Sequence, residues 1–241
     1  MNLQVSMPYE PCTYKCPFCI ARNHKHDYNF DNLYQKSRSK YLLTLQDNID
    51  IYNIKTVVLT GEADPSQNIS WVQDCVEAIH AMRKDYHFEH VKIELQTKNQ
   101  KADYSMLHGL DVLAISISSP KEFESAKELV KKYPNFIIRP TIVLSSKFNG
   151  HINYEELDLT PFKQVTFKEM QYTEDEATNE WIRTHAFIGR DDLKNLIYSY
   201  RDTVSIYYDM DCQRAIGRYM IYRSDGEVYR TWEQLPKEKR D

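Results

Sequence analysis

The sequence is poor in the residues that mark special architectures. Only 6 of its 241 residues are glycine and 9 are proline, which excludes a collagen-like or low-complexity chain. Hydrophobic residues make up 41% and charged residues 27%, a balance typical of globular rather than disordered proteins. The length is sufficient for one large domain or two small ones with a buried core. The composition therefore predicts a folded globular protein.

Long hydrophobic runs and a dominant charge are also missing. The longest apolar runs, such as residues 56–60 and 136–138, fall far short of the roughly 20 residues that span a bilayer, so we expect no transmembrane helix. Residues 1–20 lack the features of a signal peptide, which predicts a cytoplasmic protein. The net charge of −4 does not indicate binding to nucleic acid or to an anionic membrane.

Cysteine is scarce and unevenly placed. Of the five cysteines, Cys12, Cys16 and Cys19 lie within eight residues, an odd and clustered set that is unsuitable for a disulfide framework. Cys75 lies on the apolar stripe of a predicted helix, and Cys212 is isolated near the C-terminus. A second metal cluster ordinarily needs three or four thiolates, so we expect these two residues to form none.

Short β-branched runs alternate with helical segments over the first 170 residues. The predicted strands cover residues 3–7, 55–60, 91–97, 112–118, 136–144 and 164–170. Most are apolar on both faces, as in a parallel sheet that helices cover. The predicted helices cover residues 31–53, 70–84 and 121–133. This α/β pattern predicts a partial (βα)6 barrel of the TIM type.

The pattern changes after residue 170, where an acidic segment covers residues 173–180. The elements expected beyond it are a helix over 190–201, a strand over 205–209 and a hairpin of 218–223 with 227–232. The hairpin is expected because Asp225-Gly226 can supply the positive φ of a tight turn. No repeat or flexible linker intervenes, so we predict a core over residues 1–170 and a small α+β extension over 171–241, packed on the same domain.

The three clustered cysteines predict a metal centre with an open coordination position. They follow the first predicted strand in the segment CTYKCPFC, residues 12–19. A structural zinc site normally closes with four ligands, whereas three thiolates on a [4Fe–4S] cluster leave one iron open. A zinc site completed by His24 or His26 is the alternative.

The spacing of these cysteines, with Phe18 before the last one, resembles the CX3CXφC motif of the radical S-adenosylmethionine (SAM) superfamily. The resemblance covers roughly residues 1–170, because the motif lies between the first strand and first helix of the predicted barrel. It implies that Cys12, Cys16 and Cys19 each bind one iron of a [4Fe–4S] cluster. It further implies that SAM chelates the fourth iron and that Phe18 lies against the adenine.

The end of the second predicted strand resembles the Gly-Gly-Glu-like segment of the same family. Gly61 and Glu62 match, whereas Thr60 replaces the first glycine and proline follows only at Pro65. The resemblance implies that Glu62 and the backbone at Gly61 receive the SAM amino group. Gly61 would permit a close approach, and Glu62 would offer a carboxylate to an ammonium group. A glycine turn with a solvated acid is the alternative.

Polar residues near the ends of later strands complete the candidate site, since ligands of βα barrels bind at the carboxyl ends of the strands. The resemblance implies that Ser116 or Ser118 faces the SAM ribose, and a turn or capping role before Pro120 is the alternative. Arg139 interrupts an apolar strand. Because a charge is rarely buried unpaired, we expect Arg139 to reach the SAM carboxylate or a substrate anion.

Four further residues are candidates, and only two of them lie in a segment with a resemblance to the family: the sixth predicted strand resembles last-strand segments that run beside the adenine. Gln96 and Lys98, at the end of the third predicted strand, are candidates for contacting substrate. Lys168 and Glu169 are neighbours on the sixth predicted strand, so one of them should point into the barrel and the other outward.

The resemblance implies an enzyme that reductively cleaves SAM to a 5′-deoxyadenosyl radical, which abstracts hydrogen from an unidentified substrate. An electron donor such as flavodoxin or ferredoxin would be its partner. An activating enzyme for a glycyl-radical partner is an alternative within this chemistry. A non-catalytic zinc-binding module is the alternative outside it.

Overall fold

The computed structural model of the chain describes residues 1–8, 11–16, 19, 31–61, 63–144, 157–169, 195–200, 204–209 and 219–232. In chain order its elements are β1 (Asn2–Ser6), α2 (Leu33–Lys36), α3 (Arg38–Ile51), β2 (Thr56–Thr60), η1 (Pro65–Asn68), α4 (Ile69–Met82), η2 (Tyr86–Phe88), β3 (Lys92–Thr97), β4 (Val112–Ile117), α5 (Pro120–Lys132), β5 (Ile137–Leu144), β6 (Gln164–Glu169), β7 (Asn195–Tyr200), β8 (Val204–Asp209), β9 (Tyr219–Tyr222) and β10 (Val228–Tyr229).

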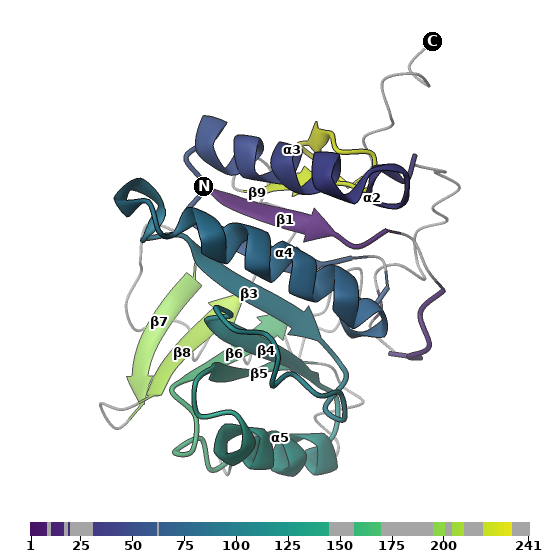
Figure 1. Ribbon diagram of the computed structural model, residues 1–241. Helices are drawn as coiled ribbons and strands as arrows, with labels where there is room; N and C mark the ends of the chain where they lie inside the picture. The colour runs from purple at the N-terminus through teal and green to yellow at the C-terminus, as the bar shows by residue number, and fades with distance from the viewer. Residues whose placement is uncertain are drawn as a thin grey trace.

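The ten strands of the described residues form one open sheet in the order β10-β9-β1-β2-β3-β4-β5-β6-β8-β7 (Figure 1). The strands from β9 to β8 in this order are parallel to one another, and β10 and β7 run antiparallel at the two edges. The six strands predicted from the sequence are β1 to β6, which lie side by side in chain order. The expected α/β fold with a partial barrel is therefore confirmed.

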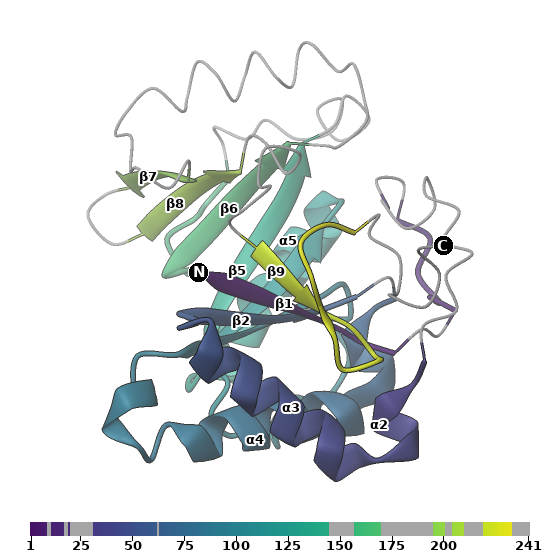
Figure 2. The ribbon, with the colours of Figure 1, turned by 90° about the horizontal axis from the view of Figure 1, so that it is seen from above.

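One face of the sheet is apolar and packs on the helices. Leu3, Val57, Ile93 and Leu113 are fully buried on neighbouring strands and belong to one cluster with Trp71 of α4. Figure 2 shows α3 and α4 on the same side of β1 and β2. Burial of this face against the helices supplies most of the hydrophobic stabilisation of the fold.

The opposite face is mixed: it carries polar or charged side chains on β1, β3, β5 and β6, but buried apolar Val58 on β2 and Ala114 on β4. The expectation that most strands are apolar on both faces is therefore wrong. Gln4 lies opposite Val58, which lies opposite Glu94, and Arg139 lies opposite Ala114 in the sheet register. Gln4, Glu94 and Arg139 alternate with core residues along their strands, so they point away from the helices. Because α3, α4 and α5 pack on the other face only, this inner face is not required to be apolar.

The helices between the first strands confirm the expected segments, with one difference. The single helix expected over residues 31–53 is divided into α2 and α3 at Ser37, whose backbone is extended at φ −158° and ψ 87°. The connection from β3 to β4, residues 98–111, consists of turns without a helix. Helices α4 and α5 begin at side-chain caps from Asn68 and Ser119 and follow the predicted ranges closely.

The extension contributes strands to both edges of the same sheet. Strand β8, expected from the sequence, pairs with β6, and β9 pairs with β1. The helix expected over residues 190–201 is wrong, because Asn195–Tyr200 is strand β7, paired with β8 along its whole length. The tyrosine-rich and apolar residues of this segment suit a strand, and pairing with β8 overrides the local helical spacing. The acidic segment 173–180 lies outside the described residues.

The predicted C-terminal hairpin is confirmed as β9 and β10, with Gly226 at a φ of +81° in the turn. It packs on the helices that follow the cysteine segment. The backbone N–H of Leu33 donates to the Ser224 carbonyl at 2.7 Å, and the Tyr222 hydroxyl donates to the Tyr41 carbonyl at 2.7 Å. Within the described ranges, no helix is long and apolar enough to cross a membrane.

Candidate functional site

The three clustered cysteines lie in the loop that leaves the carboxyl end of β1. All three are free thiols; Cys12 is exposed, and Cys16 and Cys19 are partly exposed. The backbone N–H of Cys19 donates to the carbonyl of Cys16 at 3.2 Å, which places these two residues in one tight turn. The loop therefore presents three soft ligands at the end of the sheet where barrels bind their ligands.

The thiols also interact electrostatically with one another and with the end of β3. Burial raises the pKa of the Cys16 thiol, and the neighbouring Cys19, Cys12 and Asp64 raise it further, whereas the charge of Lys98 lowers it. This donor set fits a soft metal centre. Among the residues that the structure describes, no three His, Cys, Asp or Glu side chains are already gathered around a common metal position.

Asp64 joins the carboxyl ends of β2 and β3. Its buried carboxylate accepts hydrogen bonds from the backbone N–H and hydroxyl of Ser66 at 3.0 and 2.7 Å. It also accepts from the Thr97 hydroxyl and from the backbone N–H of Lys98, both at 2.6 Å. These four bonds satisfy the carboxylate inside the protein and fix the start of η1, of which Asp64 is the N-cap.

Gly61 lies where β2 approaches the end of β1. A Cβ at this position would lie 3.1 Å from the backbone nitrogen of Met7, which itself donates to the Thr60 carbonyl at 2.9 Å. The absence of a side chain thus permits contact between two strand ends, whereas the sequence suggested close approach to a ligand.

Lys98, Ser118 and Glu122 form a second polar cluster at this end of the sheet. The Lys98 ammonium donates to the Ser118 hydroxyl and to the Glu122 carboxylate, both at 2.6 Å. Glu122 also accepts from the Ser118 backbone N–H at 2.6 Å, while the Ser119 hydroxyl caps α5 by accepting from the Glu122 backbone N–H at 3.3 Å. In this structure Ser118 therefore takes part in capping a helix, and Ser116 lies on the inner face of β4.

The charge of Glu122 is supported by these contacts. Burial acts to raise its pKa, but hydrogen bonds from Lys98 and Ser118, together with the Lys98 charge, outweigh burial and leave the pKa below the ordinary value. Lys98 is only 12% exposed. The structure thus brings together Lys98 and Ser118, which the sequence marked separately.

Arg139 has an acidic partner within the protein. Its guanidinium forms an ion pair with Glu94 on β3, and the Glu94 carboxylate also accepts from the Gln96 amide at 2.8 Å. The two charged side chains are only 17% and 8% exposed. The requirement for an anion near Arg139 is therefore met by Glu94, without a ligand.

Other predicted residues fall into two groups. Lys168 lies on the inner face, opposite Val143, while Val165 and Phe167 join the apolar core. The remaining predicted residues lie outside the described residues or have undescribed side chains: Phe18, His24, His26, Glu62, Glu169 and Cys212.

Sequence reasoning missed Asp64, Glu94, Gln67 and Glu122. Glu94 interrupts an apolar strand as Arg139 does, so the same argument would have detected it. Asp64 directly precedes Pro65. An N-cap residue followed by a proline in the first turn is a recognisable sequence signal for the start of a helix. Gln67 bonds to the backbone of Pro11 and Thr13 in the cysteine loop, and it carries no sequence signal because this loop is distant in the chain.

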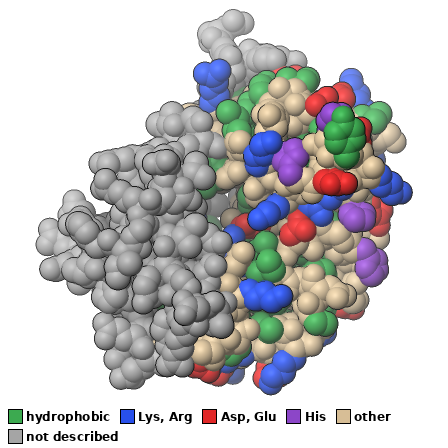
Figure 3. Space-filling view, turned by 90° about the vertical axis from the view of Figure 1, so that its left-hand side faces the viewer, with side chains coloured by type: hydrophobic (Ala, Val, Ile, Leu, Met, Phe, Trp, Pro, Cys, Tyr) green, Lys and Arg blue, Asp and Glu red, His purple; other side chains and the backbone are tan. Residues whose placement is uncertain are grey.

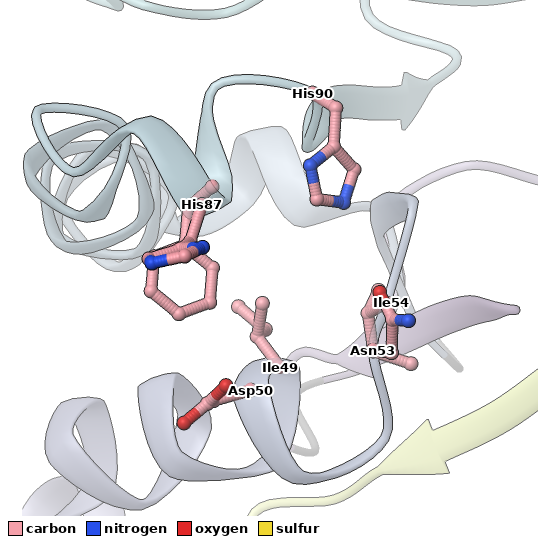
Figure 4. Close-up of a pocket in the computed structure, with 7 residues that line it drawn as sticks. Ile49, Asp50, Asn53, Ile54, His87 and His90 are labelled. Carbon is pink, nitrogen blue, oxygen red and sulfur yellow. The ribbon is translucent and has the colours of Figure 1, made fainter.

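A separate hollow lies where β2 and β3 begin, at the end of the sheet opposite to the cysteine loop (Figure 4). Its volume is about 310 Å³. It is lined by Ile49, Asp50, Asn53, Ile54, His87, Phe88 and His90. Figure 3 looks from the side where β1 and β3 begin and shows acidic, basic and histidine side chains intermixed. Since barrels bind ligands at the other end, this hollow is not the candidate site.

Comparison with solved structures identifies the fold. No model of a known protein family matches the sequence, and no curated protein matches it. Streptococcus suis SuiB bound to S-adenosylmethionine superposes with a TM-score of 0.57 over 96% of this chain, at 11% identity. anSMEcpe with bound AdoMet and the Cp18Cys peptide superposes with a TM-score of 0.60 over 98%, at 14% identity. Both are radical SAM enzymes. The chain has their fold.

The radical SAM structures are longer than this chain. The match covers 74% of anSMEcpe but only 58% of SuiB. SuiB bound to the precursor peptide SuiA gives a TM-score of 0.59 at 13% identity, over 95% of this chain and 59% of SuiB. The chain thus spans less than two thirds of SuiB, and at these identities the similarity concerns the radical SAM fold.

Proposed function

We propose that the protein is a radical SAM enzyme that holds one [4Fe–4S] cluster through Cys12, Cys16 and Cys19 and binds SAM beside it. The observation that supports this most strongly is the position of three free thiols in one loop at the carboxyl end of β1, in a chain with the radical SAM fold. Three thiolates suit an iron–sulfur cluster with one open iron. Free thiols persist in the reducing cytoplasm, where we place the protein.

When bound, the cluster and SAM would supply a 5′-deoxyadenosyl radical that abstracts hydrogen from the substrate. The chain's own residues would position the ligands. Glu62 and the Gly61 backbone follow β2 and would receive the SAM amino group, and Phe18 would lie against the adenine. Metal binding would draw the three thiols to a common centre.

The inner face would hold SAM and the substrate. Ser116 is the better candidate for the SAM ribose, since Ser118 bonds to Lys98 and Glu122. Arg139 is already paired with Glu94, so a carboxylate of SAM or of the substrate would have to bind Arg139 beside Glu94. Gln96 and Lys98 border this region at the end of β3 and are candidates for substrate contact.

Iron content and SAM cleavage test the proposal. Anaerobically reconstituted protein should bind about four irons per chain. With dithionite replacing a donor such as flavodoxin or ferredoxin, it should release 5′-deoxyadenosine. Replacing any one of Cys12, Cys16 and Cys19 with Ala should abolish cleavage, because one iron loses its protein ligand. Zinc in place of iron, or wild-type turnover in any of these variants, would refute the proposal.

The remaining cysteines provide the matched control. The combined change Cys75→Ala and Cys212→Ala should leave iron at one cluster per chain, since Cys75 is fully buried in the core among apolar residues. A second cluster in the wild-type protein that disappears in the double variant would show that the extension binds metal.

A further inference from the structure

The backbone on both sides of Cys12 is held by one side chain, that of Gln67 in η1. Its amide nitrogen donates to the Pro11 carbonyl at 3.0 Å. Its amide oxygen accepts from the Thr13 backbone N–H at 3.0 Å and from the Thr13 hydroxyl at 3.4 Å. The amide thus pairs with the peptide groups before and after the cysteine, as a neighbouring strand would.

Gln67 is itself held in place by the end of the sheet. Asp64, the cap of η1, bonds to Ser66 within the turn and to Thr97 and Lys98 at the end of β3. The 3-10 turn is followed directly by α4, whose first turn is capped by Asn68. The Gln67 backbone therefore lies between two hydrogen-bonded caps, Asp64 and Asn68, and this places the side-chain amide of Gln67 in a defined position.

Cys12 needs such support more than the other two cysteines do. Cys16 and Cys19 share a tight turn closed by their own backbone hydrogen bond. Cys12 is exposed and lies four residues before that turn. Among the described residues, the Gln67 side chain bonds to the backbone both before and after Cys12.

We propose that Gln67 is a positioning residue for Cys12, which holds the backbone of this cysteine in place before metal binds. This inference rests on the proposed function for the identity of the metal centre, but the anchoring itself does not depend on metal. Groups that orient a metal ligand contribute to affinity although they do not touch the metal. An ordered Cys12 would reduce the conformational entropy lost when the thiolate binds.

Amide hydrogen exchange in the metal-free protein tests the anchor. In Gln67→Ala, the Thr13 amide should exchange about two- to ten-fold faster than in the wild type, the range expected from losing one hydrogen bond. Gln67→Glu keeps an acceptor for Thr13 and loses the donor to Pro11, so the Thr13 amide should remain protected. Gln73→Ala is the matched control, since the Gln73 amide bonds to Glu77 on the exposed face of α4, away from the cysteine loop.

Release of iron to a chelator tests the consequence for the metal centre. From the reconstituted protein, Gln67→Ala should release iron about ten-fold faster than Gln73→Ala, with Gln67→Glu between them. Unchanged Thr13 exchange in Gln67→Ala would overturn the anchor, and equal iron release in Gln67→Ala and Gln73→Ala would overturn the positioning role. If the wild type bound zinc, the proposed function would fail, while faster Thr13 exchange in Gln67→Ala would still support the anchor.

Discussion

The two faces of the sheet are formed by the same strands but differ in the chemistry of their side chains. The face toward α3, α4 and α5 carries fully buried Leu3, Val57 and Ile93. The inner face carries Gln4, Glu94, Arg139 and other polar residues in the same register. The apolar face forms the core with the helices, and the inner face can carry charged side chains.

The difference separates residues that hold the fold from residues available for chemistry. Charged side chains are paired both on the inner face, as Arg139 with Glu94, and at the carboxyl end of the sheet, as Lys98 with Glu122. A paired charge can remain partly buried at tolerable cost, whereas an unpaired one cannot. Substitutions on the apolar face should therefore lower stability, and those at the carboxyl ends of the strands should mainly alter binding.

The largest effect is expected at Trp71, which is fully buried against the apolar face. Trp71→Ala should lower the free energy of unfolding by about 3–5 kcal/mol, because it leaves a large cavity in the core. Equilibrium unfolding in urea measures the loss. Tyr86→Ala, at a side chain that is 73% exposed, should change stability by less than about 0.5 kcal/mol. Equal losses in the two variants would contradict the assignment of the core.

The next effect tests whether the inner face also supports the fold. Arg139→Met should cost about 3 kcal/mol of unfolding free energy, because it leaves the buried Glu94 carboxylate without its cation. Adding Glu94→Gln in the same chain should restore most of the loss by removing the uncompensated charge. Urea unfolding at neutral pH compares the variants. A double variant as unstable as Arg139→Met alone would show that the charge pair is not the cause.

A smaller effect, on binding rather than stability, is expected at Glu62. Glu62→Gln should raise the dissociation constant for SAM by roughly ten- to a hundred-fold, since a charge-assisted hydrogen bond contributes about 1.5–3 kcal/mol. Iron content should be unchanged, because no iron ligand is removed. Anaerobic calorimetric titration with SAM measures the affinity. An unchanged affinity in Glu62→Gln would indicate that Glu62 is a solvated turn residue.

The smallest effect is expected at Glu122 and depends on pH. Because its pKa in the folded protein is lowered, the folded state binds a proton less tightly than the unfolded chain does. The Glu122–Lys98 pair therefore stabilises the fold at neutral pH, and this contribution is lost as the pH falls below the ordinary value of 4.5 through the lowered pKa.

At pH 7, Glu122→Gln should cost about 1 kcal/mol of unfolding free energy, and the difference from wild type should shrink in acid. Urea unfolding at several pH values measures both quantities. The control is Glu128→Gln, whose pair with Lys131 is exposed on both sides and should contribute little at any pH. A difference that persists unchanged in acid would exclude the charge of Glu122 as its source.

Local signals in the sequence were sufficient for much of the fold. Apolar β-branched runs predicted β1 to β6, helical spacing predicted α4 and α5, and Asp225-Gly226 predicted the terminal hairpin. They failed at β7, because a short apolar and tyrosine-rich segment fits a helix or a strand, and only pairing with β8 decided between them. The boundary between core and extension at residue 170 stays a prediction.

By itself, the sequence determined the six strands β1 to β6 and the cluster of Cys12, Cys16 and Cys19, because these features depend on neighbours along the chain. The tertiary structure alone decided that the extension joins both edges of the sheet, that Glu94 neutralises Arg139 and that Gln67 holds the backbone around Cys12. These contacts join residues separated by 45 or more positions, and spacing along the chain carries no information about such pairs.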